Sequence, residues 1–121
     1  ADIFDKIKDW LPDEHADDED VASYSEDGKV LLSVDTDTEN FTIPDGVTEI
    51  GEHAFEDCKS LKKLNIPNSV TEIGAWAFSY CESLEKIHIA DSVTKIGEKA
   101  FVYCDSLEKI NIPDGVKIVV G

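Results

Sequence analysis

A 23-residue pattern occurs three times in succession, and it constrains the fold of this chain more than any other feature. The copies cover residues 43–65, 66–88 and 89–111, and a fourth copy begins at Ile112. Ile, Val, Ile, Gly, Ala-Phe, Cys and Ser-Leu recur at fixed offsets, whereas the residues between them are polar and vary. A fixed period of about 20 to 29 residues is typical of a solenoid, whose units bury their apolar residues only by stacking on one another.

Each copy predicts two short strands and a turn. The Leu-x-x-Leu-x-Ile pattern of residues 61–66 predicts a strand whose apolar side chains face inward. Val-Thr-x-Ile, at residues 70–73, predicts a second extended piece, and Gly74 after it is expected to adopt a positive φ. Ala77-Phe78 then begins a predicted helical turn that ends near the cysteine. The expected fold class is therefore an α/β repeat solenoid of about three to four 23-residue coils.

The first 40 residues lie outside the repeat. Residues 2–11 predict a short helix, and residues 13–20 predict an acidic linker. We expect the helix either to cover the N-terminal end of the solenoid or to bind a partner. The apolar residues that would share one helix face are Ile3, Phe4, Ile7, Trp10 and Leu11.

Asp-Gly between two strand-like runs predicts a β-hairpin within residues 21–40. A hairpin placed there would cap the first edge strand of the array. The expected organisation is a helix with an acidic linker over residues 1–20, the capping hairpin over residues 21–40 and the solenoid over residues 41–121.

The chain is strongly acidic, with a formal net charge of −16. Residues 1–40 carry 14 Asp and Glu against 3 Lys, and residues 41–121 carry 13 against 8. Because such a chain repels phosphate groups, we expect no nucleic-acid binding. No apolar run of about 18 residues occurs and the N-terminus is acidic, so we expect neither membrane insertion nor an intact signal peptide.

The repeat pattern IPxxVTxIGxxAFxxCxSLxxIxIP resembles the BspA-like leucine-rich repeats, and the resemblance covers residues 41–121. It implies a right-handed leucine-rich-repeat solenoid with strands on one face. It also implies a bacterial cell-surface or secreted protein with a role in adhesion or protein binding and no shared catalytic site. The three cysteines, which the spacing leaves unpaired, keep a cytoplasmic location open.

Side chains that point outward from the predicted strands are the first candidates for partner binding. They form two columns along the stack, and a basic column on an acidic protein suits an acidic partner or a glycan. The alternative interpretation is that these residues only keep an exposed strand face soluble. The columns are Lys63, Lys86 and Lys109, and Asn65, His88 and Asn111, with Lys62, Glu85 and Glu108 beside them.

Trp76, Tyr80 and Tyr103 are the second candidates, because they predict an exposed aromatic patch on the convex side. The alternative for Trp76 is packing against the helix predicted at residues 2–11.

No residue pattern predicts an enzyme, a cofactor or a metal site. His15, His53 and His88 lack a second histidine or paired carboxylates. The cysteines occupy an inward position of each coil, so we expect buried, inert thiols.

The C-terminal residues Ile118, Val119 and Val120 form an apolar edge that predicts self-association. The leading hypothesis is a non-enzymatic protein- or glycan-binding adhesion module. The alternative is a structural spacer or self-assembly unit with no ligand of its own.

Overall fold

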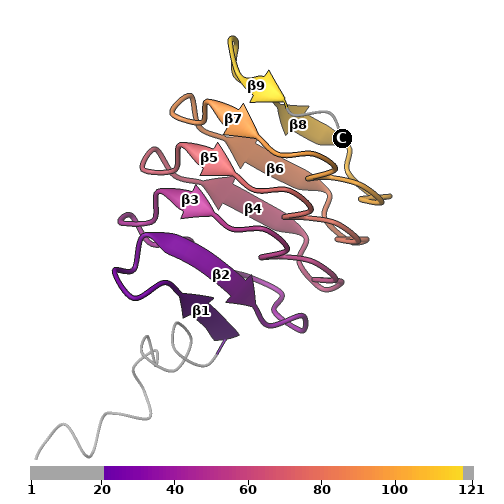
Figure 1. The fold of residues 1–121 in the computed structure, drawn as a ribbon. Coiled ribbons are helices and arrows are strands. Elements are labelled where there is room, and N and C mark those ends of the chain that lie inside the picture. Colours follow the sequence, from indigo (N-terminus) through magenta and orange to yellow (C-terminus); the bar gives the residue numbers. More distant parts are fainter. Residues whose placement is uncertain (1–20, 119–121) are drawn as a thin grey trace, which may run out of the picture.

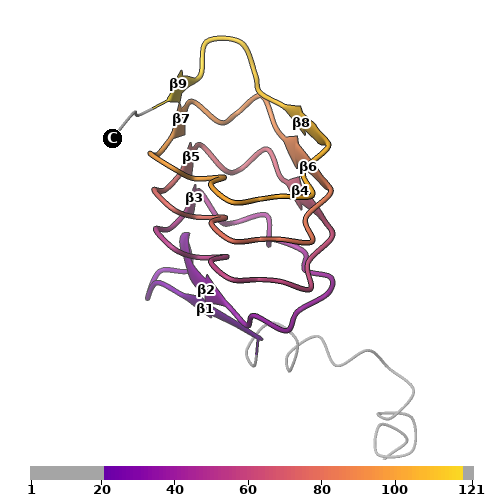
Figure 2. The ribbon, with the colours of Figure 1, turned by 90° about the vertical axis from the view of Figure 1, so that its right-hand side faces the viewer.

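The computed structural model describes residues 21–118, and for Lys109 its backbone only. Its regular elements are nine strands in two sheets, one on each side of a stack of coils (Figures 1 and 2). The six-stranded sheet has the order β1-β2-β3-β5-β7-β9, and the three-stranded sheet has the order β4-β6-β8. The strands are β1 (Ala22–Tyr24), β2 (Val30–Val34), β3 (Glu49–Ile50), β4 (Lys63–Ile66), β5 (Glu72–Ile73), β6 (Lys86–Ile89), β7 (Lys95–Ile96), β8 (Lys109–Asn111) and β9 (Lys117–Ile118).

The register of both sheets follows the sequence repeat. In the three-stranded sheet, Lys63 pairs in parallel with Lys86, and Leu64 pairs with Ile87. In the other sheet, Glu72 pairs with Lys95. Strands β4 and β6 alternate exposed and buried side chains, as the period-two pattern predicts. The predicted solenoid of about four coils is thereby confirmed.

The third side of each coil contains turns where the sequence predicted a helical turn, so that prediction was wrong. Backbone N–H groups of His53, Phe55 and Asp57 donate to carbonyls of Ala75, Ala77 and Ser79 in the next coil. Intervening N–H groups donate within the same coil. Because every second N–H group bonds to the next coil, the segment cannot form the i to i+4 hydrogen bonds of an α-helix.

Six non-glycine residues in these turns have positive φ values. The residues are His53 (62°), Asp57 (62°), Trp76 (59°), Tyr80 (60°), Lys99 (53°) and Tyr103 (60°). This conformation costs about 1 to 2 kcal/mol for a side chain with a Cβ atom. For His53, Asp57, Trp76 and Tyr80, a hydrogen bond from the backbone N–H to the next coil offsets this cost. The expected α/β repeat is therefore a β repeat in the described residues.

The glycine that recurs in each coil allows the coils to pack closely. The prediction that this glycine has a positive φ was wrong. Gly51, Gly74 and Gly97 do not have a φ in the left-handed region. A Cβ atom on Gly74 would lie 2.8 Å from the backbone nitrogen of Glu52 and 2.9 Å from the carbonyl carbon of Gly51. Glycine is required there because the preceding coil leaves no room for a side chain.

The predicted hairpin is present and begins the larger sheet. Strands β1 and β2 are antiparallel, and β2 pairs in parallel with β3. Gly28 in the connecting turn has a φ of 75°. The backbone N–H of Lys29, and then the hydroxyl of Ser25, donate to Asp27 and lower the pKa of its carboxyl.

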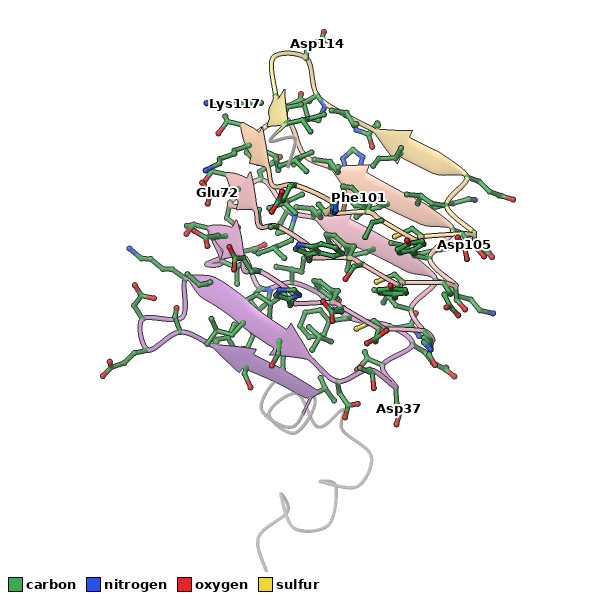
Figure 3. All side chains as sticks on the ribbon, turned by 45° about the vertical axis from the view of Figure 1, so that its right-hand side comes forward. Asp37, Glu72, Phe101, Asp105, Asp114 and Lys117 are labelled. Carbon is green, nitrogen blue, oxygen red and sulfur yellow. The ribbon has the colours of Figure 1, made fainter. Side chains whose placement is uncertain are left out.

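Ladders of equivalent side chains fill the space between the sheets. The rings of Phe55 and Phe78 stack with centroids 4.8 Å apart, and those of Phe78 and Phe101 stack at 5.2 Å. Figure 3 shows Phe101 turned into the stack, whereas Glu72 and Lys117 point outward. The core is thus one continuous column that each coil extends by one layer.

The last described coil leaves its share of this column open. Ile110, Ile112 and Ile118 are 37%, 45% and 51% exposed, whereas the equivalent Ile87, Ile89 and Ile96 are at most 3% exposed. The helix predicted at residues 2–11, the acidic linker at residues 13–20 and the edge residues Val119 and Val120 lie outside the described residues.

Candidate binding surface

The outward side chains of β4, β6 and β8 form the surface that the sequence predicted, here called the strand face. Lys63 aligns with Lys86, and Asn65 aligns with His88 and Asn111. These five side chains are exposed. The backbone of Lys109 continues the lysine column, and its side chain is outside the described part.

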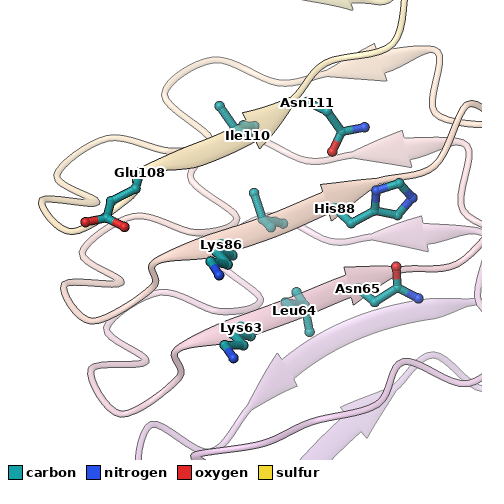
Figure 4. Close-up of a pocket in the computed structure, with 9 residues that line it drawn as sticks. Lys63, Leu64, Asn65, Lys86, His88, Glu108, Ile110 and Asn111 are labelled. Carbon is teal, nitrogen blue, oxygen red and sulfur yellow. The ribbon is translucent and has the colours of Figure 1, made fainter.

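A shallow hollow of about 730 Å³ lies between the two columns (Figure 4). Its lining surface is mostly apolar and includes Leu64, Ile87 and Ile110, and Glu108 is the one carboxylate among its lining residues. Lys63 and Lys86 lie along one side, and the labelled Asn65, His88 and Asn111 lie along the other. The strand face therefore combines cations, neutral hydrogen-bonding groups, one carboxylate at its last strand and a mostly apolar lining.

Four lysines gather where β4 and β6 begin, and we call Lys59, Lys62, Lys63 and Lys86 the lysine patch. All four are exposed, and none forms an ion pair within 4.0 Å with a described carboxylate. Lys59 and Lys62, together with Glu39, also line a smaller hollow of about 330 Å³. Lys59 was missed from the sequence, although comparing positions 59, 82 and 105 of the three copies would have shown its change of charge.

The same positions in later coils carry the opposite charge. Glu82 and Asp105 replace Lys59, and Glu85 and Glu108 replace Lys62. The positive region is therefore confined to the first full coil and the column that starts at Lys63.

Asn111 is exposed, but its side-chain amide is already engaged by the fold. Its Nδ2 donates to the carbonyl of Ile89 at 3.1 Å, and its Oδ1 accepts from the N–H of Ile89 at 3.3 Å. Asn111 therefore links the last coil to β6. Its amide has fewer free hydrogen-bonding groups for a partner than the side chains of Asn65 and His88 have.

The aromatic candidates on the turn side form two stacks. Trp76 lies between His53, whose ring is parallel to it at 6.3 Å, and the Lys99 ammonium at 5.1 Å from its ring centroid. Because both ring faces are covered, Trp76 is not an open aromatic contact. Tyr80 and Tyr103 stack at 4.8 Å and are 39% and 56% exposed, so they form a small exposed pair.

One polar cluster near Trp76 contains residue types that catalysis uses. His53 Nδ1 contacts Glu56, and the Ser79 hydroxyl donates to Glu56 Oε2 at 3.1 Å. The hydrogen bond with His53, and then the one with Ser79, lower the pKa of Glu56. A hydrolytic triad requires the imidazole between the hydroxyl and the carboxylate. Here the carboxylate is central and Ser79 is fully buried, so the cluster cannot present a nucleophile.

The three cysteines are free thiols at equivalent positions; Cys58 and Cys81 are buried as predicted, whereas Cys104 is only partly buried. Cys81 Sγ donates to the Phe55 carbonyl and Cys104 Sγ to the Phe78 carbonyl, both at 3.0 Å. The hydrogen bond with Cys104 and burial raise the pKa of Cys81. A raised pKa keeps the thiol protonated, so Cys81 is a poor nucleophile at neutral pH.

Alkaline pH is expected to destabilise the protein through Cys58. Burial, and then the charges of Asp35 and Asp57, raise the pKa of Cys58 to about 12. The unfolded thiol titrates at about 8.5, so the stabilising contribution is present below that pH and is lost progressively above it. The loss is about 1.4 kcal/mol per pH unit. Urea unfolding at pH 7, 9 and 10 with a reductant measures it.

The control for this prediction is Cys58→Ala, which keeps all other alkaline titrations. Above about pH 9, the free energy of unfolding should fall less steeply with pH for Cys58→Ala than for the unchanged protein. The difference between the two slopes should be about 1.4 kcal/mol per pH unit. Equal slopes for the two proteins would show that Cys58 ionises as readily in the folded state as in the unfolded state.

In residues 21–118, no three His, Cys, Asp or Glu side chains converge into a group that could hold a metal ion. The same part of the chain contains no helix with the length and apolar character needed to cross a membrane.

Two facing sheets, in which the strands of successive 23-residue coils pair in parallel, define a leucine-rich-repeat solenoid. The family model for the BspA type leucine rich repeat region matches residues 34–120 with six copies. The chain therefore belongs to the BspA-type leucine-rich repeat family. No relative is found among the curated proteins.

Two solved structures support the same assignment. A leucine-rich repeat protein of T. pallidum is 28% identical with a TM-score of 0.71, and the match covers 80% of this chain and 49% of that protein. A leucine-rich repeat protein of Bacteroides ovatus is 31% identical with a TM-score of 0.62, covering 81% of this chain and 30% of that protein. The chain thus spans about half, or less, of the length of these relatives.

Proposed function

We propose that this chain is a binding module of a bacterial surface or secreted protein, and that the strand face contacts a partner protein. Leucine-rich repeat families of this type supply protein-interaction or structural modules and are generally non-enzymatic. The observation that carries the proposal is the lysine patch beside the hollow, because its cations are exposed and have no described ion-pair partner. A glycan partner, and adhesion as the biological outcome, are the other forms of this proposal.

The size of the face limits the affinity that one module can reach. Three strands spaced by about 4.8 Å give a face about 15 Å wide, which is narrow beside the ~800 Å² per partner of a standard interface. We therefore expect weak binding by one module and stronger binding where several modules engage together.

Biolayer interferometry against a panel of extracellular-matrix proteins and glycans tests the proposal. The variant Lys63→Gln/Lys86→Gln removes two positive charges from the strand face, and Lys95→Gln/Lys117→Gln removes two from the opposite sheet. We expect any panel partner to lose about tenfold in affinity with the first variant and less than about twofold with the second. The absence of any binding partner, or equal effects of the two variants, would refute the proposal.

A self-assembly unit is the second candidate, and the exposure of Ile110, Ile112 and Ile118 favours it. An open core column is covered when another layer stacks on it. Light scattering separates the two candidates. A concentration-dependent dimer that Ile118→Lys abolishes supports assembly, and a monomer at all concentrations contradicts it.

A further inference from the structure

We infer that the partner segment is a short acidic stretch of polypeptide with an apolar residue next to its carboxylates. This inference rests on the proposed function and names the chemistry of the ligand at that same face.

The charge distribution is the first support. The chain has a net charge of −16, yet Lys59, Lys62, Lys63 and Lys86 gather without a described carboxylate within 4.0 Å. Clustered like charges repel one another in the free protein. An acidic segment placed over the patch removes that repulsion and gains charge-assisted hydrogen bonds to several ammonium groups.

The limits of the patch favour a short segment over a uniform polyanion. A long acidic polysaccharide that follows the stack from the first full coil would pass Glu82 and Glu85, and then Asp105 and Glu108, at positions equivalent to Lys59 and Lys62. Like charges in register are destabilising. A few carboxylates over the first full coil meet Lys59, Lys62 and Lys63, with Glu39 the only carboxylate among the residues that line the hollow beside Lys59 and Lys62.

The hollow is the second support for the inference, because it can bind the apolar residue of the segment. Its surface is mostly apolar and adjoins Lys63 and Lys86, so an apolar side chain can follow the carboxylates into it. Asn65 and His88 on its far side offer an amide and an imidazole, which can donate to or accept from the backbone of a bound peptide. A polysaccharide has no apolar side chain to fill this space.

Fluorescence anisotropy with labelled peptides tests the inference. The probe is Glu-Glu-Glu-Glu-Leu-Leu. The comparison peptides replace the four Glu by Gln, or the two Leu by Gly, and a glucuronate oligosaccharide of similar charge represents the glycan. We expect the probe to bind most tightly and to weaken when salt is raised from about 50 to about 300 mM. Lys63→Gln/Lys86→Gln should weaken it about tenfold, and Lys95→Gln/Lys117→Gln less than about twofold.

Four results would overturn the inference: binding of either the Gln peptide or the Gly peptide as tight as that of the probe, binding of the oligosaccharide at least as tight, equal effects of the two lysine variants, or no probe binding at all. A variant with its six Asp and Glu residues at positions 13–20 changed to Asn and Gln adds a further arm. Probe binding by that variant alone would assign the patch to the acidic stretch of the chain itself and would also overturn the inference.

Failure of the inference is distinguishable from failure of the proposed function. If a panel protein still depends on Lys63 and Lys86 while the acidic probe does not bind, the ligand chemistry is wrong and the binding face stands. If neither depends on these lysines, both are refuted.

Discussion

Changing Gly74 to Ala should lower the free energy of unfolding by about 2 to 3 kcal/mol, because the added methyl group overpacks a site whose neighbouring atoms cannot move away. The new methyl group would meet three backbone atoms of the preceding coil at 2.8, 2.9 and 3.0 Å. Those atoms belong to a coil that is hydrogen-bonded on both sides, so they cannot move without loosening two interfaces. Urea unfolding followed by circular dichroism measures the loss.

Gly46→Ala is the matched control, because the same chemical change meets nothing within 4 Å and Gly46 does not have a positive φ. Its free energy of unfolding should stay within about 0.5 kcal/mol of the original or rise slightly, since alanine restricts the unfolded chain more than glycine does. Similar losses for Gly46→Ala and Gly74→Ala would contradict the close-packing explanation.

Changing Phe78 to Ala should cost about 3 to 5 kcal/mol, the range for a large buried aromatic residue. The ring is fully buried and stacks on Phe55 at 4.8 Å and on Phe101 at 5.2 Å. Its loss therefore opens a cavity in the middle of the core column and removes two ring contacts. The midpoint of urea unfolding measures the effect.

Phe101→Ala is the comparison for this prediction. Phe101 is only partly buried and has one described ring partner, so its loss should cost less than half as much. Equal costs at positions 78 and 101 would mean that the column does not act as a continuous core. Phe78→Leu should recover part of the stability because it refills most of the volume.

Much of the fold follows from the sequence because stacking repeats one local solution. The period sets the parallel register that joins Lys63 to Lys86, and strand alternation sets which side chains are exposed. The hairpin around Gly28 follows from local turn chemistry. These features depend on residues that are close in the sequence and on the 23-residue period, and both can be read from the sequence alone.

The turn side could not be predicted, because its conformation depends on contacts between coils. Trp76 and Tyr80 give no local signal for a positive φ, and the hydrogen bonds from their N–H groups to Glu98 and Val102 join residues 22 positions apart. The recurring threonine has a similar explanation. Thr71 donates both its N–H and its hydroxyl to the Thr48 carbonyl of the coil before.

The two columns of the candidate surface could be predicted from the sequence. The lysine patch could not. Equivalent positions identified Lys63 and Lys86, whose backbones pair as expected. No lysine side chain in the described residues forms an ion pair within 4.0 Å, so what the folded chain adds is that Lys59 and Lys62 line one hollow and Lys63 and Lys86 another. The engagement of Asn111 with Ile89 depends in the same way on the position of the last strand.

The hydrogen bonds between coils also determine how the protein responds to tension. Thr71 bonds back to Thr48 and Phe55 bonds to Ala77, so the bonds on these sides of the coil join one layer to the next. A force that separates the first and last coils breaks the hydrogen bonds of one such interface before those of the next. Each coil that detaches releases 23 residues, or about 80 Å of extended chain. The solenoid should therefore lengthen under load in regular steps of one coil, while the coils that are still stacked keep their fold.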